Sequence, residues 1–209
     1  MIKVGDIMNK YIRLMDGTKS NAGGFEFKIG EINIAEKWNP TMPNPIDMGG
    51  FNFSTEEKIL RWIHRGDTVY DVTLPPSAEI IDCQSENCPH GVFRTNKIIL
   101  TNPRKVTEDM VLDFYKKSNL PEKTYYQCLV VLLYKNYINV AKYIIKDRIN
   151  KNNINDCIKE FEKMITDKND GKIYKFKYNE LWNEAKEIYD ILLKIKNHQD
   201  NIKENQINI

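Results

Sequence analysis

The sequence lacks the long apolar run that a membrane-spanning helix requires. Such a helix needs about 20 consecutive apolar residues, whereas the most apolar stretch, residues 128–134, is much shorter. Residues 1–14 carry acidic side chains and lack the apolar segment of a signal peptide. Together these absences predict a cytoplasmic protein, in a bacterium or in a host cell, with a virion as the alternative location.

A surplus of one charge is also missing. The chain has 31 lysines and arginines against 29 aspartates and glutamates, a net charge of +2, and the two signs are interleaved. Nucleic acids and anionic membrane surfaces are bound through clustered Lys and Arg. The sequence therefore predicts neither kind of binding, and another protein is the macromolecular partner that it leaves open.

Cysteine and histidine are scarce, with four and three residues. Cys83, Cys88 and His90 form the one cluster that resembles a metal site, because thiolates and imidazoles suit zinc. A structural zinc site needs four ligands, so Asp82 or Glu86 would have to complete it. The alternative, which the spacing favours, is a polar loop with two reduced thiols. No metal site is therefore predicted.

The familiar motifs of nucleotide binding and catalysis are absent as well. The chain contains no GxGxxG between a strand and a helix, no P-loop, no HExxH and no GxSxG. Any site must therefore be built from residues that are scattered along the sequence and meet only in the fold.

What the sequence does contain is a series of short strands in its first half. Apolar and polar residues alternate in several runs that are bounded by Gly, Pro or Asn. A single helix interrupts them, which predicts an α+β domain with a mixed or antiparallel sheet over residues 1–105. The expected strands are residues 11–14, 25–29, 31–34, 51–53, 69–74, 78–82, 92–94 and 97–100.

Local signals predict where that helix and the sheet begin and end. Ser54 and Glu57 have the spacing of a capping box, which predicts that the helix begins after Ser54. Gly66 is expected to end the helix in the left-handed conformation. Pro103 is expected to end the sheet, and residues 35–50, which hold three prolines, are expected to form a loop.

The second half has a helical character. Apolar residues recur at helical spacing from about residue 106, where Thr107 is an expected N-cap. This pattern predicts a bundle of about five helices over residues 106–198. Residues 199–209 form a polar tail that is expected to fray.

A candidate site combines arginines, carboxylates and glycines from the first half. Arginine binds phosphate through two parallel hydrogen bonds, and a carboxylate stabilises positive charge that develops on a ribose in an oxocarbenium-like transition state. The alternative, which the sequence alone favours, is that these charges are solvated or paired at the surface. The set consists of Arg13, Gly23, Gly24, Tyr70, Asp82, Glu86 and Arg94.

The stretch GGFNFSTEEKILRWIHRGDTVYDVTLPPSAEI, followed by VFRTNKIILTNPRKVTEDMV, resembles an uncharacterised family of proteins from Firmicutes, phages and large DNA viruses. The recurring pattern is GGF.FS.EE.IL.W.HRGDT.YDV..P and then RTNKIIL.NPR. The resemblance covers residues 23–148 approximately. It implies no activity.

The order of elements is also similar to the small ADP-ribosyltransferase fold, especially the rifampin-modifying type. That resemblance implies NAD as a substrate, with Arg13 in the first-strand role and Asp82 as the acidic residue. Phe51 or Phe53 would take the place of the aromatic residue that packs on nicotinamide. The family usually has His where this chain has Arg13, and the C-terminal helices have no counterpart in it.

Two functions follow as hypotheses. The first is an ADP-ribosyltransferase-like protein that transfers ADP-ribose from NAD or binds such a ligand without turnover. The second is a non-catalytic interaction protein or virion-associated protein, with the sheet as a platform and the helices for docking. The transferase hypothesis requires Arg13 and Asp82 to lie on the same face of the sheet.

Overall fold

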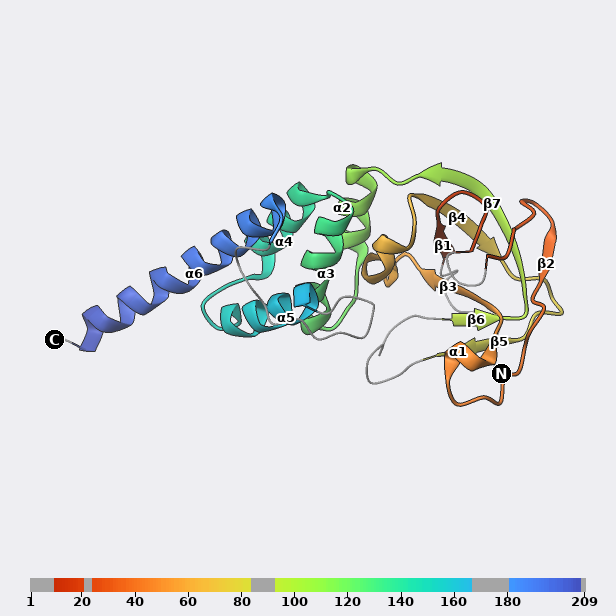
Figure 1. Cartoon of the computed structure of the whole chain (residues 1–209), viewed down its shortest axis with the longest axis horizontal. Helices are drawn as coiled ribbons and strands as arrows, with labels where there is room; N and C mark the ends of the chain where they lie inside the picture. Colours follow the sequence, from red (N-terminus) through yellow and green to blue (C-terminus); the bar gives the residue numbers. More distant parts are fainter. Residues whose placement is uncertain (1–9, 21–23, 84–92, 167–180, 208–209) are drawn as a thin grey trace. The chain divides into compact units, whose positions relative to one another are not determined.

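The structure of the 209-residue chain is a computed structural model that describes residues 10–20, 24–83, 93–166 and 181–207. Packing divides the chain into two compact units, Met1–Leu120 and Pro121–Ile209. The described strands lie in the first unit, and the described elements of the second unit are helices (Figure 1). Composition changes at about residue 105, but the packing boundary follows the next helix, because that helix packs within the first unit.

One antiparallel sheet of seven strands forms the first unit, in the order β2-β7-β4-β1-β3-β6-β5. This confirms an α+β chain with its helices toward the C-terminal end, and it selects the antiparallel alternative. Each pairing that is described between neighbouring strands is antiparallel. The strands are β1 (Tyr11–Met15), β2 (Ile32–Ile34), β3 (Phe51–Thr55), β4 (Thr68–Thr73), β5 (Ile80–Asp82), β6 (Phe93–Thr95) and β7 (Lys97–Lys105).

One face of this sheet carries the aromatic core of the unit, which we call the aromatic face. Its buried members come from β1, β3, β4 and β7 and from the segment before β2; they are Met15, Phe27, Phe51, Phe53, Tyr70, Val72, Ile98 and Leu100. Residues that alternate with these along the strands, such as Ile12 and Asp71, belong to the opposite face. The 3-10 helix η1 (Ile59–Arg65) contacts β1, and α2 (Glu108–Lys117) contacts η1.

The predicted capping box at Ser54 is wrong. Ser54 and Thr55 complete β3, where they pair with Ile12 and Tyr11 of β1. The helix that follows is the 3-10 helix η1, and its N-cap, Lys58, makes no side-chain capping bond. Both Ser54 and Thr55 are buried. Strand pairing and burial therefore outweigh the local preference of Ser54 for a helix start.

The left-handed conformation predicted for Gly66 is also wrong. Gly66 has φ 174°, an extended backbone that any residue adopts. What requires glycine is a close approach: a Cβ atom there would lie 2.5 Å from Met15 Cα and closer still to other main-chain atoms of Met15. The sequence signal was therefore right about the residue but wrong about its cause.

Two of the predicted strands differ in the structure. Residues 25–29 form no strand; only Glu26 makes an isolated bridge, to Lys19, although Phe25 and Phe27 still pack on the core. By contrast, β7 continues past Pro103 to Lys105. The register of β4 and β7 shifts by one residue at this point, and such a bulge accommodates a proline that cannot donate to the ladder.

The other helices follow the predicted apolar periodicity. A single turn, α1 (Pro45–Met48), lies in the loop before β3, and α2 begins at Thr107, whose side chain accepts from the Met110 N–H at 3.3 Å. The second unit contains α3 (Glu122–Tyr134), α4 (Ile138–Arg148), α5 (Ile154–Thr166) and α6 (Asn183–Ile207). Helix α3 contacts all three others and is the centre of this bundle. Helix α6 extends through Ile207, beyond the point where fraying was expected.

Candidate functional site

Arg13 on β1 is the most unusual of the predicted site residues. It is 9% exposed and lies on the aromatic face, with its guanidinium carbon 4.9 Å from the centre of the Phe27 ring. Its Nη1 donates to the Asn52 carbonyl, and its Nη2 lies 3.4 Å from the Ser20 hydroxyl. No carboxylate contacts this guanidinium among the described residues, and its buried Nε has no hydrogen-bond partner there.

The position of Arg13 follows from a local separation of two strands. The ladder between β1 and β3 covers Tyr11 with Thr55 and Ile12 with Ser54, and it does not extend to Arg13. The Asn52 carbonyl therefore accepts from the Arg13 side chain. On the other side of β1, Arg13 remains paired with Tyr70 of β4. Arg13 thus occupies the opening between β1 and β3.

The electrostatic surroundings of Arg13 are positive. Burial, with a smaller contribution from the charges of Arg94 and Arg65, lowers the pKa of Arg13 to about 10. Burying a cation without an opposite charge costs free energy. A bound anion would relieve both the desolvation and the repulsion between the arginines.

Asp82 lies on the same face of the sheet as Arg13. Tyr11, which shares its face with Arg13 by alternation along β1, contacts the Phe53 and Phe93 rings at 5.0 and 5.7 Å. Phe93 is paired with Asp82 of β5, and paired residues project from the same face. The strand order places β3 and β6 between β1 and β5, so about 14 Å separates Arg13 from Asp82 at three strand spacings.

An aromatic surface lies between these two residues. Phe53 and Phe93 are stacked, with ring centres 5.3 Å apart and an angle of 22° between planes. Phe53 is buried, whereas Phe93 and Tyr11 are partly exposed. Sequence reasoning did not select Phe93 or Tyr11, although each begins a strand from which a predicted site residue projects.

Phe51 and Tyr70, two other predicted site residues, make contacts that stabilise the fold. Phe51 is buried among Phe25 and Phe27, and the Tyr70 hydroxyl donates to the Gly17 carbonyl at 2.9 Å. Burial raises the pKa of Tyr70. Gly24 has φ 67° in the segment that leads to Phe25, and Gly23 and Glu86 lie outside the described residues.

Arg94 projects from the opposite face of β6. It is paired with Asn52 and Ile81, one residue out of step with Phe93, and its Nη1 donates to the Gly49 carbonyl. Burial lowers the pKa of Arg94. The positive charge of Arg94 in turn lowers the pKa of Arg13. Arg94 therefore contributes to the positive potential at Arg13 without sharing its contacts.

Of the three residues that resemble a metal site in the sequence, Cys88 and His90 lie outside the described residues. Cys83 is buried, and its Sγ lies 3.8 Å from the Ile81 carbonyl. Within residues 10–20, 24–83, 93–166 and 181–207, no three side chains of the metal-binding types gather at one point.

In the same ranges, no helix combines the length and apolarity needed to cross a bilayer.

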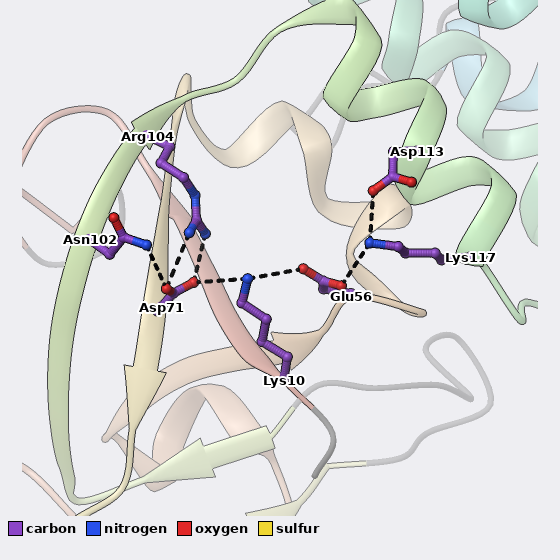
Figure 2. A network of polar contacts seen from close by, with 7 residues as sticks. All are labelled: Lys10, Glu56, Asp71, Asn102, Arg104, Asp113 and Lys117. Carbon is purple, nitrogen blue, oxygen red and sulfur yellow. Dashed lines mark hydrogen bonds and ion pairs between the residues drawn. The ribbon is translucent and has the colours of Figure 1, made fainter. Parts of the chain in front are cut away.

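A second polar constellation lies around Asp71, and sequence reasoning missed it. Figure 2 shows six charges that alternate in sign and one amide; the residues are Arg104, Asp71, Lys10, Glu56, Lys117, Asp113 and Asn102. Arg104 binds both Asp71 oxygens at 2.6 and 3.1 Å, and Lys10 lies 3.5 Å from Asp71 and 3.4 Å from Glu56. Lys117 then contacts Glu56 at 3.1 Å and Asp113 at 2.8 Å. This network joins β4, β7, the residue before β1 and the residue after β3 to α2, and its charges neutralise one another.

We expect Asp71→Asn to lower the free energy of unfolding by about 1 kcal/mol at pH 7. The hydrogen bond from Arg104 is the main cause that holds the pKa of Asp71 below its usual value, and Lys10 adds to it. A lowered folded-state pKa stabilises the protein above the unfolded pKa of about 3.9, and this stabilisation is lost as the pH falls through the folded pKa. Urea titrations should therefore show that the difference between wild type and variant shrinks as the pH falls below the unfolded pKa of Asp71.

Asp113→Asn is the matched control for this prediction. Asp113 belongs to the same network, but its side chain is 54% exposed and pairs with Lys117 one helical turn away. Such a pair contributes at most about 0.5 kcal/mol. An effect of Asp71→Asn that is equal at pH 7 and at low pH would contradict the role given to the Asp71 charge.

Comparisons with known proteins bring no further assignment. No family model matches the chain, and neither the curated proteins nor the solved structures that were searched gave a match. The function must therefore be inferred from the geometry described above.

Proposed function

We propose that the sheet unit binds NAD on the aromatic face, with Arg13 holding the pyrophosphate, and that it transfers ADP-ribose from NAD. The observation that carries this proposal is the buried Arg13 guanidinium, which has an unpaired Nε and no carboxylate in contact among the described residues. Arginine donates paired hydrogen bonds to phosphate oxygens with a geometry that lysine cannot reproduce.

The same face offers the other parts that NAD requires. The partly exposed rings of Phe93 and Tyr11 provide a stacking surface between Arg13 and Asp82. Aromatic rings bind flat heterocycles through offset stacking. Asp82 is exposed at the end of β5 and projects from the same face of the sheet as Arg13.

The reaction would proceed by cleavage of the bond between nicotinamide nitrogen and ribose C1′. The bonding electron pair leaves with nicotinamide, and positive charge develops on the ribose. The Asp82 carboxylate stabilises this charge. A nucleophile of the acceptor then forms the new bond to C1′ and releases its proton to solvent or to a carboxylate, so that the products are nicotinamide and the ADP-ribosylated acceptor.

Calorimetric titration with NAD, ADP-ribose and inorganic pyrophosphate tests the binding step. We expect Arg13→Met to weaken NAD and pyrophosphate binding about 10- to 100-fold, because a charge-assisted hydrogen bond contributes roughly 1.5–3 kcal/mol. The free variant should differ from wild type in unfolding free energy by less than about 1 kcal/mol, since replacing a buried cation by an apolar side chain relieves its desolvation.

Arg104→Met is the matched control. Arg104 lies on the opposite face and is paired with Asp71, so its loss should lower stability and leave NAD affinity unchanged. Wild-type NAD affinity in Arg13→Met, or no binding of millimolar NAD to the wild type, would overturn the proposal and favour the non-catalytic interaction protein. For the reaction, Asp82→Asn should bind NAD and release nicotinamide about 100-fold more slowly. Equal release by both proteins would exclude the role given to Asp82.

A further inference from the structure

Strand β2 forms one end of the sheet and exposes two isoleucines. Among the described residues it is paired with β7 alone, and its other edge faces away from the sheet (Figure 1). Ile32 is 54% exposed and Ile34 is 60% exposed, and both project from the same face of the strand. Edge strands are commonly protected by charges or proline within the strand, or by being very short; β2 has neither charge nor proline, and its three residues make it short.

The strand between these isoleucines is held firmly in place. Asn33 is 4% exposed, and its side-chain amide accepts from the Lys28 N–H at 2.8 Å and donates to the Lys28 and Glu31 carbonyls at 2.9 and 3.1 Å. It also approaches the Ile98 carbonyl at 3.4 Å. The open edge is thus a fixed template rather than a fraying terminus.

The ladder with β7 decides which backbone groups face outward. The Ala35 N–H donates to the Asn96 carbonyl at 2.9 Å, which identifies a hydrogen-bonded pair. Hydrogen-bonded pairs alternate along an antiparallel ladder, so Asn33 is bonded to Ile98 in the same way. The N–H and C=O groups of Ile32 and Ile34 therefore point away from β7, toward the open edge.

We propose that β2 pairs antiparallel with β2 of a second copy of this chain, about a twofold axis at Asn33. In this register Ile32 lies opposite the partner's Ile34, and Ile34 lies opposite the partner's Ile32. Both are hydrogen-bonded pairs, so the outward N–H and C=O groups of both residues are satisfied in four bonds. The four isoleucines also cover one another on one face.

Charged residues flank β2 in the sequence. Glu31 and Lys37 are exposed on either side of the strand. These charges lie outside β2, so in a dimer centred on Asn33 the paired segment is the three residues of β2 in each copy. The contact is short, below the roughly 1,000 Å² of a stable interface, so the dimer is expected to depend on concentration.

Sedimentation velocity over increasing concentration tests the association. The wild type should pass from monomer to dimer, and Ile32→Lys and Ile34→Lys should each raise the dissociation constant at least about tenfold, because lysine on an edge blocks pairing. Ile80→Lys is the matched control, since Ile80 is 40% exposed on β5 at the other end of the sheet. Circular dichroism should show that all three variants remain folded.

Cysteine cross-linking tests the register itself. Residues in a hydrogen-bonded antiparallel pair have Cα atoms about 5.5 Å apart, within the range of a disulfide. A mixture of the Ile32→Cys and Ile34→Cys proteins should therefore give a disulfide-linked heterodimer under oxidation, whereas each variant alone should not. A wild type that stays monomeric, equal loss of association in Ile80→Lys, or cross-linking of each single variant would overturn the proposal.

Discussion

Replacing Gly66 by alanine should destabilise the sheet unit by about 3–5 kcal/mol, more than overpacking with side-chain neighbours usually costs. The added Cβ would meet Met15 Cα at 2.5 Å and other Met15 main-chain atoms more closely. Because Met15 is paired with Thr68 in β1 and β4, it cannot move without disturbing the ladder. Urea unfolding followed by circular dichroism would measure the loss.

Two further glycines separate the steric effect from backbone strain. Gly30 has φ 81° with no atom within 4 Å of an added Cβ. Gly30→Ala should therefore cost only about 1–2 kcal/mol, the cost of an L-residue in the left-handed conformation. Gly49 has φ 75°, and an added Cβ would also lie 2.7 Å from the Lys37 carbonyl carbon, so Gly49→Ala should combine both costs. If Gly66→Ala were as stable as Gly30→Ala, the close approach of Gly66 to the Met15 main chain would be contradicted.

The largest effect in the helical unit is expected from Phe161→Ala, about 3–5 kcal/mol. Phe161 on α5 is fully buried, and its ring stacks on Tyr189 of α6 with centres 5.9 Å apart and 22° between planes. Helix α5 also packs on α3. Removing the ring leaves a cavity beside Tyr189 and removes one of the contacts that join α5 to α6.

Amide hydrogen exchange locates this loss, because α5 and α6 should lose protection together. Phe161→Leu keeps most of the volume and should cost less than about 1.5 kcal/mol. Tyr143→Ala on α4 is the surface control; Tyr143 is 43% exposed, and its replacement should change stability by less than about 0.5 kcal/mol. Equal effects of Phe161→Ala and Tyr143→Ala would contradict the packing of α5 described here.

The two proposals, NAD binding and self-association through β2, depend on different residues. NAD binding depends on Arg13 on the aromatic face, whereas self-association depends on Ile32 and Ile34 at the edge. Since Arg13 and these isoleucines belong to β1 and β2, which are separated by β7 and β4 in the sheet, each set of variants can fail without affecting the other.

Several structural features could be predicted from the sequence because their causes are local. Thr107 caps α2 through a bond to an amide three residues away, and the buried residues of α4 and α5 follow helical spacing. The strand alternation around Val69 and Val72 is equally local. Such signals act over one or two turns, so chain neighbours are sufficient to determine them.

Other features were decided by contacts between distant segments. Ser54 became a strand residue because β1 pairs with it, and Gly66 is required by Met15, which no local pattern reveals. The candidate site has the same origin. The sequence supplied Arg13 and Asp82 as residue types, but only the strand order brought them to one face, with Phe53 and Phe93 between them. Burial of Arg13 away from any described carboxylate likewise arises from the separation of β1 and β3, because desolvation depends on what surrounds a charge in space.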